Sequence, residues 1–255
     1  MVDFTGKEHF DFSDVVALVR FLRSDGGCEW DRAQTHDSIR RNFIEEVYEA
    51  CEAMDDPEHL KEELGDVLLQ VVFHAGLEQD AGHFTVDDVC DGICRKLIAR
   101  HPHLFAGGER QDWETMKRAQ RGNQTVGEAM QGVSKALPAL WRADKILSKA
   151  EKSGFRWNDI SDSVAKLEEE LHELKDALHG SGDPAEELGD LLFAAVSVAR
   201  QLSLDPEDVL NHSCSKFTGR FSAMEAATAR EGQALSSMSA EELLVYWSKA
   251  KAASE

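Results

Sequence analysis

Several patterns are scarce in this chain of 255 residues, which holds five prolines and two tyrosines. No stretch alternates apolar and polar residues over the length of a strand, and no run of 18 consecutive apolar residues occurs. A half-buried strand needs that alternation, and a membrane-spanning helix needs about 20 apolar residues. The sequence therefore favours an all-α fold with no membrane partner.

Cysteine is also scarce, with five residues, an odd number and no C-x-x-C pair. This usage is typical of a reducing compartment and gives no reason to expect disulfides or a zinc site. Residues 1–4 lack the basic segment and apolar run of a secretory leader. We therefore expect a cytoplasmic protein.

Positive charge is sparse, since 28 lysines and arginines stand against 48 acidic residues, for a formal net charge of −20. A nucleic-acid backbone or an anionic membrane surface would require clusters of basic side chains. The composition therefore argues against both partners. Small phosphates stay compatible with it, because a bound cation reverses the sign of the charge locally.

Acidic residues occur in pairs at helical spacing in the C-terminal half. Glu170 and Glu173 lie one turn apart on the border of an apolar stripe, formed by Val164, Leu167, Leu171, Leu174 and Leu178. Glu187 and Asp190 have the same spacing beside a second stripe, formed by Leu188, Leu191, Leu192, Ala195, Ala199 and Leu202. Glycines and a proline over residues 179–184 predict a turn between two antiparallel helices. Packing the stripes together would bring four carboxylates to one seam.

Such a seam predicts a cation site. Two carboxylates about 4 Å apart repel by about 4 kcal/mol at the effective dielectric near a protein surface, so converging acids are unstable without a cation. Oxygen ligands favour Mg²⁺, with Mn²⁺ as a substitute.

The same acids recur in the first half, each displaced by 124 positions: Glu46, Glu49, Glu63 and Asp66. The phrase Glu-Leu-Gly-Asp follows in both halves, and the spacing of Gly27 and Trp30 recurs as Gly154 and Trp157. One acidic pair is usually only a solvated helix face, but a repeated set predicts a duplicated unit with a metal site in each copy.

The repeat sets the expected organisation: a domain over residues 1–121, a polar linker over 122–136 and a second domain over 137–255. We expect helices over residues 13–23, 37–54, 58–79, 86–100 and 137–152, a loop over 28–36 and a last helix that begins after Ser239. In the second of these helices, the residues expected to face the core are Phe43, Val47, Ala50 and Met54.

Cations follow the acids in both copies. Lys96 and Arg100 lie four residues apart in the first half, as do Lys216 and Arg220 in the second. Side chains at this spacing share one helix face, which can bind the charge of a polyphosphate that a metal leaves unneutralised.

The doubled E-E-x-x-E and E-x-x-D pattern resembles the MazG family, the all-α nucleoside triphosphate pyrophosphohydrolases. The resemblance implies a homodimer that hydrolyses NTPs and dNTPs to the monophosphate and pyrophosphate with Mg²⁺ and a metal-activated water. It implies catalytic acids at Glu169, Glu170, Glu173, Glu187 and Asp190. It also implies nucleotide contacts at Lys166, Glu169, Lys216, Arg220 and Trp247.

The two copies differ at one cation. Lys166 lies one turn before Glu170, whereas the matching position in the first copy is Asn42. We therefore expect the C-terminal copy to be catalytic and the N-terminal copy, with Lys96 and Arg100, to bind nucleotide more weakly.

Two alternatives stay open from the residues alone. Glu169 and His172 form one E-x-x-H of the kind found in di-iron carboxylate bundles, although the first copy has Tyr48 in place of the histidine. A non-enzymatic regulatory or partner-binding helical module is the other alternative.

Overall fold

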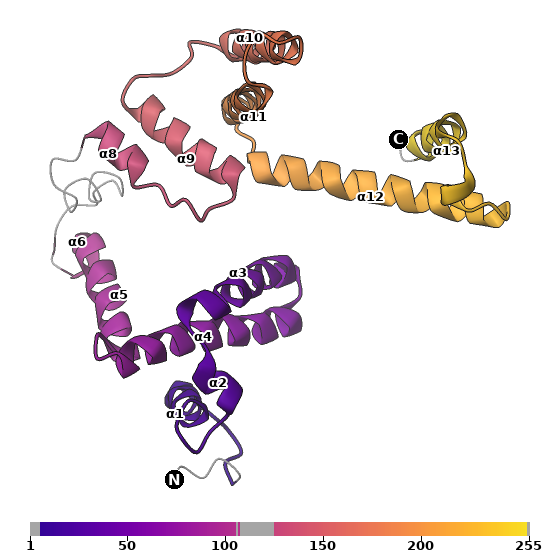
Figure 1. Ribbon diagram of the computed structural model, residues 1–255. Coiled ribbons are helices and arrows are strands. Elements are labelled where there is room, and N and C mark those ends of the chain that lie inside the picture. The colour runs from indigo at the N-terminus through magenta and orange to yellow at the C-terminus, as the bar shows by residue number, and fades with distance from the viewer. Residues whose placement is uncertain (1–5, 106, 108–124, 254–255) are drawn as a thin grey trace. The chain divides into compact units, whose positions relative to one another are not determined.

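The computed structural model describes residues 6–105, 107 and 125–253, and every regular element in those ranges is a helix. The chain forms two compact units, Met1–Lys117 and Arg118–Glu255, and each is considered by itself (Figure 1). The all-α fold and its tandem arrangement are thereby confirmed. The expected boundary at residues 121 and 122 lies outside the described residues. None of the described helices is long and apolar enough to span a membrane.

The N-terminal unit is built around an antiparallel helix pair. α3 (His36–Glu52) begins at a capping box formed by Thr35 and Ser38, and α4 (Pro57–Asp80) begins at Asp56, with proline in its first turn. The other elements are α1 (Phe12–Leu22), α2 (Glu29–Ala33), η1 (Ala53–Asp55), α5 (Val86–Arg100) and α6 (Pro102–Phe105).

Two expectations in this unit need correction. Residues 28–36 are not only a loop, because α2 occupies five of them, a helix too short to show a hydrophobic period in the sequence. The core face of α3 is also narrower than expected. Ala50 is buried and Phe43 is half-buried, but Val47 and Met54 are 42% and 64% exposed.

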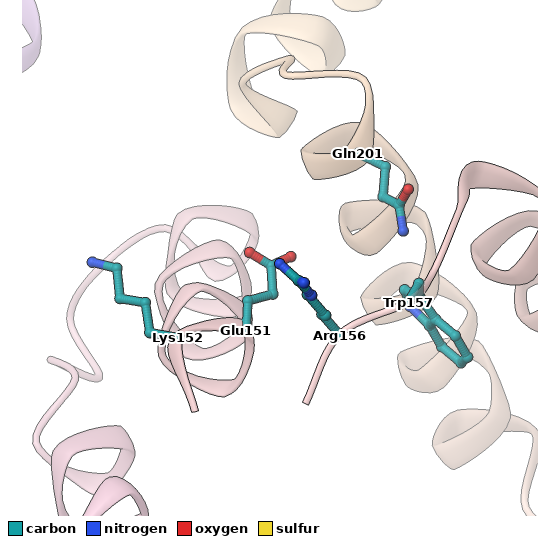
Figure 2. Close-up of a pocket in the computed structure, with 5 residues that line it drawn as sticks. All are labelled: Glu151, Lys152, Arg156, Trp157 and Gln201. Carbon is teal, nitrogen blue, oxygen red and sulfur yellow. The ribbon is translucent and has the colours of Figure 1, made fainter. Parts of the chain in front are cut away.

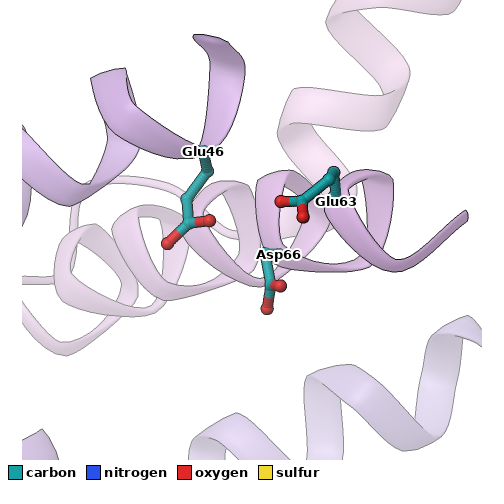
Figure 3. Close-up of side chains that lie close together, drawn as sticks. All are labelled: Glu46, Glu63 and Asp66. Carbon is teal, nitrogen blue, oxygen red and sulfur yellow. The ribbon is translucent and has the colours of Figure 1, made fainter. Parts of the chain in front are cut away.

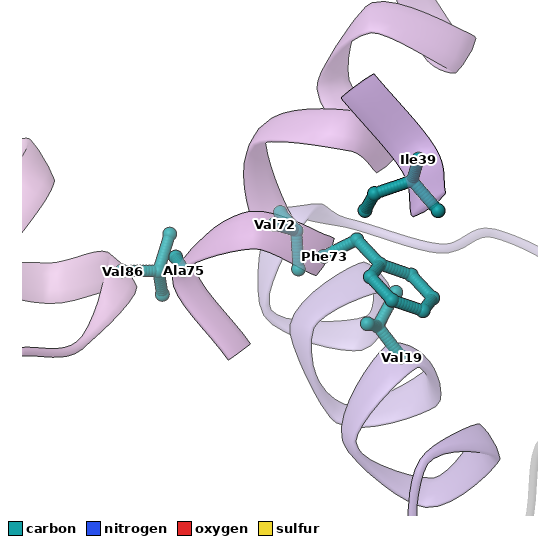
Figure 4. Close-up of a cluster of buried hydrophobic side chains, with 6 residues drawn as sticks. All are labelled: Val19, Ile39, Val72, Phe73, Ala75 and Val86. Atoms are coloured by element: carbon teal, nitrogen blue, oxygen red, sulfur yellow. The ribbon is translucent and has the colours of Figure 1, made fainter. Parts of the chain in front are cut away.

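The buried core of this unit lies where α4 crosses its neighbours (Figure 4). Val72 and Phe73 of α4 pack with Val19 of α1 and Ile39 of α3, and the cluster continues toward α5. Burying side chains of this kind contributes about 1.5–3 kcal/mol each. The packing fixes α3 against α4, and both carry the N-terminal acids.

The C-terminal unit repeats this plan with α9 (Ala139–Lys152), α10 (Ile160–Leu178), α11 (Pro184–Gln201) and α12 (Pro206–Arg230). Asp183 and Asp205 cap α11 and α12, each followed by proline. The capping box of Ser239 and Glu242 opens α13 (Ala240–Ala252), as expected. η2 (Leu235–Ser237) precedes α13. α8 (Val126–Gln131) lies within the stretch expected to be a linker.

The apolar stripe of α10 is only partly covered by its own unit, because Leu167 and Leu174 are half-buried and the other stripe residues are exposed. Its buried residues are Ser163, Glu170 and Ala177, whereas Leu171 and Leu178 are 42% and 69% exposed. On α11 the expected stripe is likewise open at several leucines: Leu188, Leu192 and Leu202. Helical spacing defines an apolar face but does not say which molecule covers it.

In each unit an arginine forms ion pairs between two corresponding helices, but a different helix supplies the arginine in each unit. In the C-terminal unit Arg200 of α11 reaches back to α9, where it forms ion pairs with Asp144 and Glu151. In the N-terminal unit Arg23, at the end of α1, reaches forward to Asp80 on α4 with an N–O distance of 2.7 Å. Arg23 thus ties α1 to the end of α4, and Arg200 ties α9 to the end of α11.

A histidine cluster is specific to the N-terminal unit. Nδ1 of His74 lies 2.7 Å from Nδ1 of His36, whose Nε2 lies 2.6 Å from Glu78. Glu78 also contacts His83 at 2.6 Å, and the ring of Phe43 lies 5.3 Å from that of His74. Burial lowers the pKa of His74, and the charge of His36 lowers it further. The folded state therefore binds this proton less readily than the unfolded chain does.

We expect the thermal unfolding midpoint to fall as pH is lowered through about 6.5, the value for an unfolded histidine. The folded pKa lies below the unfolded one, so the destabilisation begins near the unfolded pKa and is complete below the folded pKa. The neighbouring charged groups are Arg20 of α1 and Arg23, directly after it, which bond to Gln79 and Asp80. His74→Phe should reduce the pH dependence, and an unchanged dependence would contradict the assignment.

Candidate functional site

Three carboxylates converge in the C-terminal unit. α10 places Glu170, and the first turns of α11 place Glu187 and Asp190 opposite it. One oxygen atom of each lies within 4.8 Å of an oxygen atom of the other two. The antiparallel pairing expected from the turn at residues 179–184 therefore brings three of the four expected acids together.

Glu170 is the buried member, with 6% of its surface exposed. Its Oε1 lies 2.8 Å from Nζ of Lys166, while its Oε2 is buried and has no hydrogen-bond partner among the described residues. An unpaired buried carboxylate oxygen costs free energy unless a cation or donor satisfies it. Mg²⁺ takes oxygen ligands at about 2.0–2.1 Å in octahedral geometry, which three acids within 4.8 Å can approach by small side-chain movements. The residues thus fit a divalent cation.

Lys166 bridges two acids of α10. Its Nζ lies 2.8 Å from Oε1 of Glu169 and 2.8 Å from Oε1 of Glu170. The hydrogen bond to Glu169, followed by the one to Glu170, raises the pKa of Lys166. Glu169 is therefore held by a cation on the outer side of α10 and is not one of the three clustered carboxylates.

Glu173 is not one of the three clustered acids either. Contact with the Glu170 carboxyl, followed by burial, raises the pKa of Glu173. Burial, followed by the neighbouring charges of Glu186 and Asp190, raises the pKa of Glu187. Burial and neighbouring carboxylates thus both disfavour the ionised forms of Glu173 and Glu187.

The N-terminal copy has the matching cluster, in which Glu46 of α3 faces Glu63 and Asp66 of α4 (Figure 3). Burial, followed by the charge of Asp66, raises the pKa of Glu46. Glu49 does not belong to this cluster of three. Glu63 is bound instead by a residue that the sequence reasoning missed, His59, whose Nε2 lies 2.9 Å from Oε1 of Glu63. Its place one turn before Glu63 was the available signal.

The expected nucleotide-binding cations lie on other helices. Lys216 and Arg220 are on α12, which leaves α9 and α11 after its first turns and runs toward α13 (Figure 1). Trp247 of α13 packs against Phe217 of α12, with ring centroids 5.0 Å apart. Among the described residues, neither Lys216 nor Trp247 bonds to the acid cluster. In the N-terminal unit Lys96 and Arg100 lie on α5.

The histidine of the E-x-x-H pattern is also outside the cluster. The side chain of His172 is 75% exposed and lies 3.8 Å from Asp176, one turn further along α10. The described cluster therefore offers carboxylates without an imidazole, which does not favour a di-iron ligand set.

We expect Glu187→Gln to raise the thermal unfolding midpoint of the metal-free protein by a few degrees at neutral pH, because the variant removes a charge that other acids repel. The folded pKa of Glu187 lies above its unfolded value, so its ionised form is unfavourable in the folded state. The stabilisation by Mg²⁺ should shrink in the variant. Unfolding with EDTA or Mg²⁺ measures both effects, and an equal gain from Mg²⁺ in both proteins would exclude Glu187 as a ligand.

Comparison with known proteins shows what this architecture is similar to. A family model described as the MazG nucleotide pyrophosphohydrolase domain matches residues 34–105 and 160–223, which contain both acid clusters. The nucleoside triphosphate pyrophosphohydrolase/pyrophosphatase MazG of Thermotoga maritima is 43% identical over 255 residues, covering 96% of this chain and 97% of that protein. The nucleoside triphosphate pyrophosphohydrolase of Escherichia coli K12 is 35% identical over 251 residues, covering 93% and 95%. The uncharacterized protein YabN of Bacillus subtilis is 43% identical and aligns over 52% of its own length.

Proposed function

Because this chain belongs to the MazG family of nucleotide pyrophosphohydrolases, we propose that its C-terminal acid cluster is the Mg²⁺ centre of an enzyme that hydrolyses NTPs and dNTPs. As a member of the family it is a hydrolase of phosphoanhydride bonds, yielding the nucleoside monophosphate and pyrophosphate. The observation that carries the assignment of the centre is the buried Oε2 of Glu170, which has no hydrogen-bond partner in the described part of the chain and lies beside two further carboxylates.

Glu170, Glu187 and Asp190 would hold the cation, with Mn²⁺ as a substitute for Mg²⁺. When bound there, the metal supplies positive charge to the phosphate oxygens and makes a bound water more acidic. We assign Glu173 to accept the proton of the attacking water, because it lies one turn after Glu170 on α10 without joining the three-acid cluster. Glu169 holds Lys166 in place.

Lys166 is the residue that should make the C-terminal copy more active in hydrolysis than the N-terminal copy. With no substrate bound it neutralises Glu169 and Glu170, and it lies close enough to the cluster to reach a phosphate group. The N-terminal copy offers Asn42 at this position and so has no cation there. We therefore assign hydrolysis to the C-terminal unit, with the N-terminal cluster as a weaker or structural copy.

A homodimer would complete the site. The exposed leucines of α10 and α11, together with Phe217 of α12 at 57% exposure, form apolar surface that one copy leaves uncovered. α12 carries Lys216 and Arg220 away from the α10 and α11 pair of its own copy (Figure 1). We propose that a second copy covers these faces and brings its α12 cations and Trp247 to the triphosphate.

The function is tested by incubating the purified chain with a panel of NTPs and dNTPs and Mg²⁺. The expected products are the monophosphate and pyrophosphate, with activity lost in EDTA and restored by Mg²⁺ or Mn²⁺. Diphosphate and inorganic phosphate as products would contradict the reaction. No pyrophosphate from any nucleotide would favour the regulatory module, and stoichiometric iron in anaerobically purified protein would favour the di-iron alternative.

A further inference from the structure

A second concave site lies in the C-terminal unit, outside the acid cluster (Figure 2). A cavity of about 390 Å³ opens where the end of α9, the segment after it and the end of α11 meet. Its lining residues are Glu151, Lys152, Arg156, Trp157 and Gln201. This volume falls in the range of small-molecule sites, roughly 300–1,000 Å³.

The aromatic wall of this cavity is held in place. The indole Nε1 of Trp157 donates a hydrogen bond of 2.8 Å to Oγ of Ser197, a buried residue of α11. The ring is 40% exposed although its polar edge is satisfied. A fixed, partly exposed indole face can stack on a planar ring with little further loss of conformational freedom.

The charge of the cavity is opposite to that of the whole chain. Glu151 contributes little free negative charge, because Arg200 binds both of its oxygens, with Nε 3.2 Å from Oε1 and Nη2 2.5 Å from Oε2. Arg156 then adds positive charge to the cavity in a chain of net charge −20. Among the described residues, the guanidinium of Arg156 has no hydrogen-bond or ion-pair partner, so its donors are available to an anion.

The N-terminal copy has the matching tryptophan, Trp30, but not the polar and cationic residues that line the cavity. At the same shift of 127 positions, Asp25 and Glu29 stand where the cavity has its lysine and arginine. At the shift of 124 positions that relates the acids, Leu77 stands in place of the glutamine. A role in packing alone would explain why both copies have the tryptophan. It would not explain why only the C-terminal copy has two cations and an amide beside it.

The cavity is separate from the metal centre. Gln201 lies 14 residues after Glu187 on the same helix, which corresponds to about 20 Å at 1.5 Å per residue. A triphosphate held at the acid cluster would not fill this cavity. Its ligand is therefore a second molecule.

We propose that this cavity binds a small anion that carries a planar ring, of the nucleoside monophosphate class. The ring stacks on Trp157, the phosphate binds the guanidinium of Arg156, and the amide of Gln201 supplies a hydrogen bond to the ring. The inference goes beyond hydrolysis at the acid cluster and does not depend on it, because it requires no metal.

The test is calorimetric titration of the full chain with AMP in EDTA, where the acid clusters hold no cation. AMP should bind saturably and more tightly than adenosine or inorganic phosphate alone. Arg156→Glu should weaken AMP about tenfold or more, the factor expected for one lost charge-assisted hydrogen bond. Lys135→Glu, the same change of charge at an exposed position outside the cavity, should leave the affinity unchanged.

Tryptophan variants form a second matched pair. Trp157→Leu should weaken AMP, whereas Trp30→Leu in the other copy should not. Should Trp157→Leu fail to fold, Arg156→Glu decides the question. No AMP binding by the wild-type chain, equal binding by Arg156→Glu, or binding lost only in Glu170→Gln would each overturn the proposal. Hydrolysis measured with Mg²⁺ is a separate readout, so the two proposals can fail independently.

Discussion

Glu170→Gln should lower kcat/KM for NTP hydrolysis by about a hundredfold or more, whereas the matched Glu46→Gln should leave most of the activity. The two glutamates occupy the same place in the two copies and each lies in a three-acid cluster. The substitution keeps the shape of the side chain and removes its charge. At Glu170 it would remove the proposed cation ligand and one of the two carboxylate partners of Lys166.

The difference between the two variants rests on Lys166. Glu46 has Asn42 one turn before it, so no lysine lies at that position to guide a triphosphate toward the N-terminal cluster. Both copies should therefore bind a cation, but only the C-terminal copy should bind the triphosphate in a position that allows hydrolysis. Glu173→Ala and Glu49→Ala form a second pair on the same helices, and the loss should again fall on the C-terminal variant.

The measurement is kcat/KM for the four single variants with Mg²⁺, after circular dichroism has shown that each is helical and folded. Equal losses at Glu170 and Glu46 would show that the two clusters are equivalent or coupled. A larger loss at Glu46 would place hydrolysis in the N-terminal unit and contradict the assignment to Lys166.

Mixing two inactive variants should restore about a quarter of the wild-type activity if the site is shared between copies. Glu170→Gln lacks the acid of α10 and Lys216→Ala lacks the cation of α12. Random exchange of subunits makes half of the dimers mixed, and one of the two sites in each mixed dimer then has both wild-type residues. Neither variant alone can form such a site.

The mixture should stay inactive if the site is not shared between copies. If each chain supplied its own Lys216 to its own Glu170, no combination of the two variants would contain an intact site, and the mixture would stay inactive. The control mixes Glu170→Gln with Glu187→Gln, which lie in one cluster and should not complement. Light scattering gives the mass of each sample, and a monomer at micromolar concentration would contradict the dimer itself.

The helices were largely predictable because their signals are local. Asp205 with Pro206, and Ser239 with Glu242, mark helix starts through hydrogen bonds within one turn, and the structure shows both. α2 escaped prediction because five residues are too few to establish a period. The acid repeat predicted both clusters because i, i+3 spacing survives any packing of the helices.

What escaped prediction depends on contacts between distant segments. The sequence placed four acids at each seam, and the structure brings three of them within 4.8 Å of one another in each unit. The rotation of a helix about its own axis depends on packing against its neighbour, which residue spacing alone does not give. The outward leucines of α10 were assigned to the core for the same reason. The cavity beside Trp157 joins residues more than 40 positions apart, and no periodicity links them.

Because Arg23 and Arg200 lie on different helices of the two units, a single helix from one unit should not be able to replace its counterpart in the other. If α9 replaced α1, the recombinant would lose Arg23 and leave Asp80 without its partner, while gaining two acids that Arg200 no longer serves. The reverse graft would bring two arginines to one region. Recombination between the halves should therefore succeed only when α1 is transferred together with α4, or α9 together with α11. Each unit therefore contains a pair of helices with its own charge balance.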